Sequence, residues 1–379
     1  MAGIYIHIPF CKQACHYCDF HFSTSLKRKG ELLHCLVKEI ELRKEELNKS
    51  AIETIYFGGG TPSLLTIKEL NLLIDTVYKN FKVVANPEIT LEANPDDLSN
   101  DQIHKLAKTR INRLSIGIQS FFDEDLTMMN RAHSAKEAKI SLSEATRHFD
   151  NITIDLIYGI PNLTNQRWKE NLQIAFDFGV NHISSYALTV EPKTALATFI
   201  QQGTYPNVSE ETALEHFKIL VSNTEKKGFV QYEISNFGKP DYFSKHNTSY
   251  WQGKLYLGIG PSAHSFNGEQ RSWNISNNIK YIRAIQQNEL PSTNEILSDI
   301  DKFNEYIMTG LRTIWGISLD SVEENFGLEF KNHLLKNSEK FVNENLLFVS
   351  NENEKRKILG TTSKGKFLVD GIASDLFMI

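Results

Sequence analysis

Short runs of β-branched and aromatic residues alternate with longer amphipathic segments between residue 4 and about residue 227. The short runs predict strands at residues 4–10, 53–57, 88–93, 113–119, 152–158 and 182–189. The longer segments predict helices at residues 29–49, 67–80, 100–108, 135–149, 165–178 and 210–227, with Ser99 and Thr164 as N-caps. This alternation is typical of repeated β/α units around a parallel sheet, and each crossover is long enough for a right-handed connection.

Six successive β/α units predict an incomplete barrel, about three quarters of the eight-unit closed form, with its mouth at the carboxyl ends of the strands. Polar and glycine-rich residues follow five of the predicted strands: Cys11–Cys18, Gly58–Pro62, Glu92–Pro95, Gln119–Ser120, and Asp155 with Tyr158–Pro161. Because parallel strands bring these ends together, we expect a functional site at the mouth.

The regular alternation ends near Gly228. Residues 232–237 and 254–260 predict short extended pieces, and helical stretches follow from about residue 299. Residues 346–349 and 356–359 predict a hairpin across a polar turn at 351–354. We therefore expect a partial (β/α)6 barrel over residues 1–230, a barrel extension and connecting segment over 231–298, and a small, mostly helical domain of winged-helix type over 299–379.

Composition narrows the function class. The 379 residues allow one large α/β domain and a smaller unit. A net charge of −5 and a pI near 6.2 provide no basic excess, which argues against a nucleic-acid partner. The N-terminus does not resemble a secretory signal, and no apolar run reaches the roughly 18 residues of a membrane span. The sequence thus predicts a cytoplasmic protein without a membrane span.

Three of the four cysteines, Cys11, Cys15 and Cys18, lie within eight residues of one another. Three thiolates can bind an inorganic centre, but they leave one coordination position unfilled, so the motif indicates a metal site open to a further ligand. A structural zinc loop with His16 or His21 as fourth ligand is the alternative. Cys35 lies on an apolar helical pattern, where we expect a buried thiol.

The CxxxCxxC spacing, Tyr17 before the last cysteine, and the Gly58–Pro62 turn after the next predicted strand together resemble the radical S-adenosylmethionine (SAM) superfamily. Within it, the chain is most similar to the oxygen-independent coproporphyrinogen III oxidase family, and closer still to the heme-chaperone branch of that family. The segments that carry this resemblance are Tyr5–Cys11, Tyr56–Ser63, Glu92–Pro95, Ser115–Phe121, Asp155–Pro161 and His246–Trp251.

The resemblance implies a [4Fe-4S] cluster on Cys11, Cys15 and Cys18, and a SAM site. The residues that it places at the SAM site are Tyr5, Tyr17, Gly59, Gly60, Thr61, Glu92, Gln119, Arg131 and Asp155. Their chemistry suits that role, because acids can accept from an ammonium or ribose hydroxyls and an arginine can pair with a carboxylate. From the residues alone, Arg131 could equally be a solvated surface residue, and Tyr5 and His7 could simply fill the barrel.

Two features separate the chain from the oxidase itself. Phe20 stands where the oxidase pattern has a further cysteine, and the chain begins only four residues before Tyr5, whereas the oxidase carries an extra N-terminal segment. The branch resemblance implies a third cofactor, heme, with His246, Asn247, Tyr250 and Trp251 as candidate binding residues and His264 as a weaker candidate.

The leading interpretation is therefore a heme chaperone without coproporphyrinogen oxidase activity. It implies an electron donor and heme-accepting proteins, including membrane-associated respiratory components, as partners. The alternatives are a coproporphyrinogen III oxidase and an iron-sulfur module without turnover.

Overall fold

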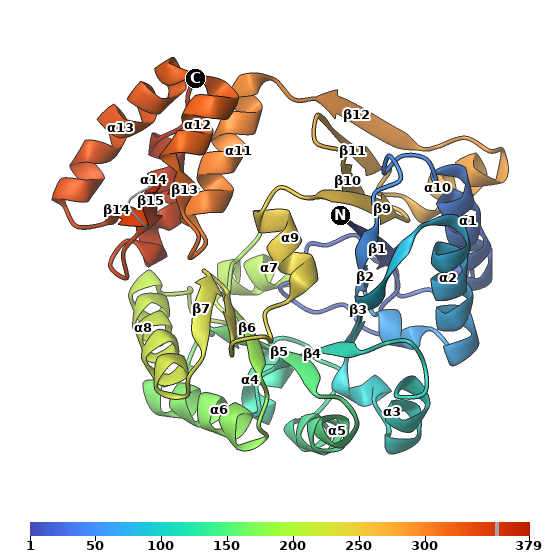
Figure 1. Ribbon diagram of the computed structural model, residues 1–379. Coiled ribbons are helices and arrows are strands. Elements are labelled where there is room, and N and C mark those ends of the chain that lie inside the picture. The colour runs from blue at the N-terminus through green and yellow to red at the C-terminus, as the bar shows by residue number, and fades with distance from the viewer. Residues whose placement is uncertain (353–355) are drawn as a thin grey trace.

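The computed structural model describes residues 1–352 and 356–379, and its largest feature is one curved twelve-stranded sheet (Figure 1). The strands are β1 (Ala2–Ile8), β2 (Ile52–Gly59), β3 (Val83–Ala93), β4 (Arg113–Gln119), β5 (Asn151–Tyr158), β6 (His182–Ala187), β7 (Val230–Glu233), β8 (Asn236–Gly238), β9 (Leu255–Ile259), β10 (His264–Phe266), β11 (Gln270–Asn274) and β12 (Ser292–Ile296). Strands β1 to β6 pair in parallel in chain order. The predicted six-stranded partial barrel is confirmed.

Helices connect these strands and cover the outer face of the sheet (Figure 1). The predicted ones are α1 (Lys29–Leu42), α2 (Ile67–Asn80), α3 (Asn100–Leu106), α5 (Ala135–His148), α6 (Asn165–Asp177) and α8 (Glu210–Lys226). Ser99 and Thr164 cap α3 and α6, accepting hydrogen bonds from the backbone N–H groups three residues later. The first helix is shorter than predicted, because the chain turns after Leu42 and reaches left-handed backbone at Asn48 and Lys49.

Several short elements were not predicted. They are α4 (Asp123–Met128), α7 (Ala195–Gln201), α9 (Lys245–Trp251) and α10 (Asn278–Gln286), with the 3-10 turns η1 (Pro62–Leu64) and η2 (Pro95–Asp97). Each is about two or three turns or less, too short for a hydrophobic period to stand out in the sequence.

The segment after the sixth unit extends both edges of the sheet. Strand β9 pairs in parallel with β1 and leads into the antiparallel strands β10, β11 and β12, whereas β8 and β7 pair antiparallel beyond β6. The pairing of β9 with β1 joins residues more than two hundred positions apart in the sequence. A contact of this kind cannot be predicted from a local sequence pattern. The segment at 231–298 is thus part of the barrel wall.

The C-terminal part has its own hydrophobic core, which includes Phe303, Ile307 and Leu334. Its elements are α11 (Asp299–Leu311), β13 (Ile317–Ser318), α12 (Leu319–Phe326), α13 (Leu328–Asn343), β14 (Leu347–Glu352), β15 (Arg356–Thr361), η3 (Lys366–Leu368) and α14 (Val369–Asp375). Strands β14 and β15 form the predicted hairpin, and β13 adds a third strand. The predicted turn extends into residues 353–355, which lie outside the described residues.

A mostly helical part with a hairpin agrees with the expected winged-helix-like arrangement, although the hairpin is followed by η3 and α14 and so does not end the chain. The domain boundaries stay predictions. Among the helices of residues 1–352 and 356–379, none is both long and apolar enough to cross a bilayer.

Candidate functional site

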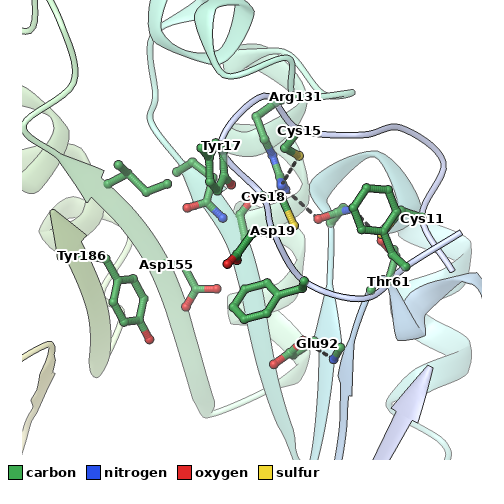
Figure 2. Close-up of a pocket in the computed structure, with 18 of the residues that line it drawn as sticks. Cys11, Cys15, Tyr17, Cys18, Asp19, Thr61, Glu92, Arg131, Asp155 and Tyr186 are labelled. Carbon is green, nitrogen blue, oxygen red and sulfur yellow. Dashed lines mark hydrogen bonds between the residues drawn. The ribbon is translucent and has the colours of Figure 1, made fainter. Parts of the chain in front are cut away.

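A cavity of about 570 Å³ opens at the carboxyl ends of the parallel strands, where the sequence placed the site (Figure 2). This volume is within the range of small-molecule and cofactor sites. All the residues predicted for the cluster and for SAM line it: Tyr5, Cys11, Cys15, Tyr17, Cys18, Gly59, Gly60, Thr61, Glu92, Gln119, Arg131 and Asp155. The structure therefore brings together residues from six separate segments, and their individual ligand roles stay predictions.

The cysteine loop is held against the connection between α4 and α5. Gln13 Nε2 donates to the Asn130 side-chain oxygen at 2.7 Å, and Asn130 Nδ2 donates back to the Ala14 carbonyl at 2.7 Å. The His16 backbone N–H donates to the Met129 carbonyl at 3.1 Å, and its ring Nδ1 lies 2.8 Å from the Met128 carbonyl. These contacts fix the loop before any ligand binds, which reduces the ordering that ligand binding requires.

The three thiols at the cavity are half-buried and free of disulfides. Burial raises the pKa of Cys11, and it raises the pKa of Cys18 to about 11. Thiols with raised pKa values are neutral at physiological pH, so binding a metal centre must release their protons. Cys35, by contrast, is buried, with its Sγ 3.7 Å from the Ile282 carbonyl, as expected of a structural thiol.

The geometry does not favour the zinc alternative. Three thiolates on one zinc ion lie roughly 3.8 Å apart, given Zn–S bonds of about 2.3 Å in a tetrahedron. The Sγ atoms of Cys11, Cys15 and Cys18 do not all lie within 4.8 Å of one another in the part of the chain that the structure describes. His16 is engaged with the Met128 carbonyl, and His21 Nε2 lies 2.8 Å from Asn278 Oδ1. A wider centre with several iron atoms suits this spacing better.

The glycine turn after β2 is required by packing against β1. Gly59 adopts φ +105°, and a Cβ there would lie 2.7 Å from the His7 ring. A Cβ on Gly60 would lie 2.6 Å from the Phe10 carbonyl oxygen. Glycine is thus needed for the close approach of the ends of β1 and β2. The cysteine loop follows β1 and Thr61 follows β2, so this approach brings both to the cavity.

Two half-buried carboxyl groups, Glu92 and Asp155, line the floor of the cavity (Figure 2). Glu92 accepts from the Tyr56 hydroxyl at 2.8 Å and from the Gly59 backbone N–H at 3.2 Å. Burial, reinforced by the charge of Asp155, raises the pKa of Glu92 to about 7. Burial likewise raises the pKa of Asp155 to about 7, although nearby Arg131 opposes the shift. A cationic ligand would compensate both acids and favour their ionised forms.

Arg131 resolves an alternative that the sequence left open. It is half-buried, and its guanidinium donates to Asn94 Oδ1 at 2.6 Å and to the Gly117 carbonyl at 2.9 Å. Its Nη1 lies 3.4 Å from Cys15 Sγ. Arg131 is therefore a cavity residue in contact with a cluster-ligand candidate, and the solvated-surface interpretation is wrong.

Gln119 has an unusual backbone for a side chain other than glycine. It ends β4 with φ +65° and is buried at the cavity. Left-handed backbone is unfavourable for such a residue and is concentrated at functional sites. This conformation turns the chain at the strand end and leaves the Gln119 amide in the cavity wall.

The candidate heme residues do not form an open ligand site. His246, on α9, is 2% exposed, and its Nδ1 and Nε2 lie 2.7 Å from Thr54 Oγ1 and 2.8 Å from the Tyr250 hydroxyl. Burial lowers the pKa of His246 to about 3. Both ring nitrogens therefore have partners, so iron ligation by His246 requires one of these contacts to open, and this role stays a prediction.

The other members of the motif point in different directions. Asn247 lines a second, smaller cavity of about 60 Å³ that shares Glu92 and Asp155 with the main one. Trp251 packs on the Arg312 guanidinium, 5.2 Å from its ring centre, and so contacts the C-terminal part. The heme-binding role of Asn247, Tyr250 and Trp251 stays a prediction.

Sequence reasoning missed other cavity residues. Tyr186 near the end of β6 and Asp19 next to the last cysteine line the cavity (Figure 2). Thr189 and Glu191, in the segment after β6, line it as well. The signal for Tyr186 and Thr189 was available, because both lie in the C-terminal half of the sixth predicted strand, on the side where the mouth of the barrel was expected. The exposed fraction of Tyr186, 45%, confirms that it opens onto solvent.

Known proteins resemble this chain over most of its length. The model of the radical SAM superfamily matches residues 5–175, and the model of the HemN C-terminal domain matches residues 297–354. The protein named "Heme chaperone HemW" from Bacillus subtilis (strain 168) is 35% identical over 86% of this chain and 87% of its own length. The chain belongs to the HemW family. The HemW protein of Lactococcus lactis subsp. lactis (strain IL1403) is 31% identical over 97% of each chain.

The fold of this HemW family member is also that of a solved structure. Coproporphyrinogen III oxidase (HemN) from Escherichia coli, a radical SAM enzyme, superposes with a TM-score of 0.85 over 100% of this chain and 90% of that one, at 22% identity. At this identity the likeness establishes the radical SAM fold alone.

The donor set fits the cofactors of the superfamily, a [4Fe-4S] cluster and SAM. Three free thiols, with Arg131 beside Cys15, match a cluster bound by three thiolates. The two acids, Glu92 and Asp155, and the aromatic Tyr17 in one cavity match a cationic ligand with an adenine ring. When both are bound, the cluster supplies an open iron position and one electron to SAM.

Proposed function

We propose that this protein is a heme chaperone: it carries a [4Fe-4S] cluster and SAM, binds heme, and transfers the heme to acceptor proteins. The observation that carries the proposal is the identity of 31% to 35% with two proteins named heme chaperones, over 86% to 97% of the chain. An electron donor to the cluster and heme-accepting proteins, including membrane-associated respiratory components, are the partners that this function requires.

Coproporphyrinogen III oxidase is the second candidate, because the fold is shared with HemN. We propose that the chain lacks this activity. Phe20, at the position where the oxidase pattern has a further cysteine, lines the cavity with a side chain that is 72% exposed. An exposed phenyl ring at the cavity rim neither binds metal nor moves protons, and it offers an apolar contact instead.

The experiment that tests the function measures both activities on one preparation. The cluster is reconstituted under anaerobic conditions, and heme binding and transfer to apo-acceptor proteins are measured beside decarboxylation of coproporphyrinogen III. We expect heme binding and transfer without protoporphyrinogen IX formation. Steady formation of protoporphyrinogen IX would contradict the chaperone proposal.

For the heme itself, we propose the inner face of the sheet at β9, β10 and β11. Residues paired across neighbouring strands lie on the same face of a sheet, and so do residues two positions apart on one strand. Tyr256 is paired with Gly3, which is two positions from the cavity residue Tyr5, so Tyr256 lies on the inner face. Phe266 is opposite Tyr256, so Phe266 and His264, two residues earlier on β10, share this inner face. An aromatic strip therefore continues from the cavity wall along the open side of the barrel.

His264 is the better placed of the two candidate histidines. It is exposed, and its ring is stacked with that of Trp273 at a centroid distance of 6.1 Å. His246 would have to break one of its two hydrogen bonds to free a ring nitrogen for iron, at roughly 1 kcal/mol or more, and it would also have to leave its buried position. The segment His246–Trp251 supports the same strip, because the Tyr250 ring packs edge-on against the Tyr256 ring at a centroid distance of 4.5 Å.

A set of three variants separates the two histidines. We expect His264→Ala to remove the shift of the Soret band on heme binding and to weaken the affinity at least tenfold, whereas His246→Ala keeps an iron-ligated spectrum. His34→Ala, at an exposed histidine on α1, is the matched control. The reverse pattern, with the spectrum lost only in His246→Ala, would mean that α9 opens and that His264 is not the ligand.

A further inference from the structure

Away from the cavity, two histidine rings converge on one carboxylate oxygen. His104 Nε2 lies 2.9 Å from Glu144 Oε1, and His148 Nε2 lies 3.2 Å from the same oxygen. The two imidazole rings have a centroid distance of 4.4 Å. Within residues 1–352 and 356–379, this trio alone brings three potential metal ligands within 4.8 Å of one another.

The backbone places these side chains together. Glu144 and His148 are one turn apart on α5, so they project from the same face of that helix. His104 comes from the neighbouring α3, which lies beside α5 on the outside of the barrel (Figure 1). Both histidines are in the last turn of their helices, where the partial negative charge of the helix end favours a cation.

The distances suit a metal ion. Two ligands on a tetrahedral zinc are roughly 3.3 Å apart, since Zn–N and Zn–O bonds are about 2.0–2.2 Å. The histidine nitrogens are 2.9 and 3.2 Å from the shared oxygen, so an ion could enter after shifts of a few tenths of an ångström. Imidazole ligands favour zinc and other late first-row divalent ions over magnesium and calcium.

The surroundings of Glu144 support ligation through one oxygen. Arg147 Nη1 donates to Glu144 Oε2 at 2.9 Å, which leaves Oε1 for the histidines. The side chains of His104 and His148 are 52% and 31% exposed, so an ion can reach them from solvent.

We propose that His104, Glu144 and His148 form a binding site for one zinc ion, with water in the fourth position. The site links α3 to α5 at their C-terminal ends. These ends lie toward the amino ends of the parallel strands, opposite the cavity, so the ion stabilises the barrel wall and takes no part in chemistry at the cysteine loop. Without metal, the same three groups form an ordinary hydrogen-bonded cluster.

Zinc uptake by the cluster-loaded protein tests the proposal. Holo-protein is equilibrated with micromolar zinc under anaerobic conditions, passed through a desalting column, and analysed for zinc and iron by mass spectrometry. Iron is measured because zinc that displaced the cluster would bind the cysteines. We expect one zinc per chain in the wild type and in His34→Ala, which changes an exposed histidine on α1, and none in His104→Ala or His148→Ala, with iron unchanged in all four.

A second measurement covers variants with altered folding. The thermal unfolding midpoint of the wild type should rise with zinc concentration, because the ion binds the folded state. Glu144→Gln keeps the size and one oxygen of the side chain but removes its charge, and its midpoint should not respond to zinc. The proposal is overturned if the wild type retains no zinc, if His104→Ala retains as much as the wild type, or if zinc appears only as iron is lost.

Discussion

Replacement of Glu92 by glutamine tests the electrostatics of the cavity floor. Glutamine has the shape of the protonated acid, and its side-chain oxygen can still accept from Tyr56 or from Gly59, the two donors to Glu92. The substitution therefore removes the titration of this group while keeping most of its contacts.

The magnitude follows from the pKa of Glu92, which burial raises from 4.5 to about 7. A group with a raised pKa in the folded state stabilises the fold below its unfolded pKa, and this contribution is lost as the pH rises through the folded pKa. A shift of about 2.5 units corresponds to about 3.4 kcal/mol at 1.36 kcal/mol per unit. Because Glu92 opens onto the solvent-connected cavity, solvent screening leaves about 2 kcal/mol.

Urea denaturation measured at several pH values between pH 5 and pH 8 provides the assay. The measurements use a chain in which Cys11, Cys15 and Cys18 are serine, so that no cluster changes the charge of the cavity. The free energy of unfolding of Glu92→Gln minus that of its parent should rise by about 1.5 kcal/mol from pH 5 to pH 8, because about a quarter of the full change already occurs below pH 5. Taking this difference cancels the titration of buried histidines such as His7 and His246, which is common to both chains.

Glu211→Gln, at an exposed residue of the first turn of α8, is the matched control and should follow the profile of the parent at every pH. If the curves of Glu92→Gln and the parent run parallel from pH 5 to pH 8, Glu92 does not carry a raised pKa, and the proposed preference of this floor for a cationic ligand fails.

Two further predictions concern the cavity rim. Gly60→Ala should destabilise the fold by about 1–3 kcal/mol in urea denaturation, because the new Cβ would meet the Phe10 carbonyl. The control Gly30→Ala, in α1, has open space around its Cβ and should stabilise the fold by about 0.5–1 kcal/mol. Equal effects of the two substitutions would contradict the packing argument. Arg131→Leu should lower the reduction potential of the reconstituted cluster, since it removes a positive charge 3.4 Å from Cys15 Sγ. Arg131→Lys keeps the charge and should have a potential close to that of the wild type. An unchanged potential in Arg131→Leu would mean that Arg131 does not act on the cluster.

Much of the barrel could be predicted because its signals are local. Hydrophobic period, turn residues and caps such as Ser99 depend on neighbouring positions, so they located the six strands and the main helices. The mouth of the barrel followed from topology, since parallel strands place their carboxyl ends together. For this reason Glu92, Asp155 and the cysteine loop could be assigned to one cavity before their distances were known.

Other features depend on contacts between distant segments. The motif around His246 had the composition of a heme site, but hydrogen bonds to Thr54 and Tyr250 close it, and only the folded chain brings Thr54 there. The partner of Arg131 was equally invisible, because Cys15 lies more than one hundred residues away.

The amino-acid sequence was thus enough to predict the partial barrel, the position of the cysteine loop and the residues at the strand ends, because periodicity and strand order depend on neighbouring residues. The remaining members of the candidate SAM site, such as Arg131, came from the family resemblance. The tertiary structure decided which histidine is accessible, which groups have perturbed pKa values, and that His104 meets His148 on the outer wall. Burial and hydrogen-bond partners arise from the packing of segments far apart in the chain, and a one-dimensional pattern does not record them.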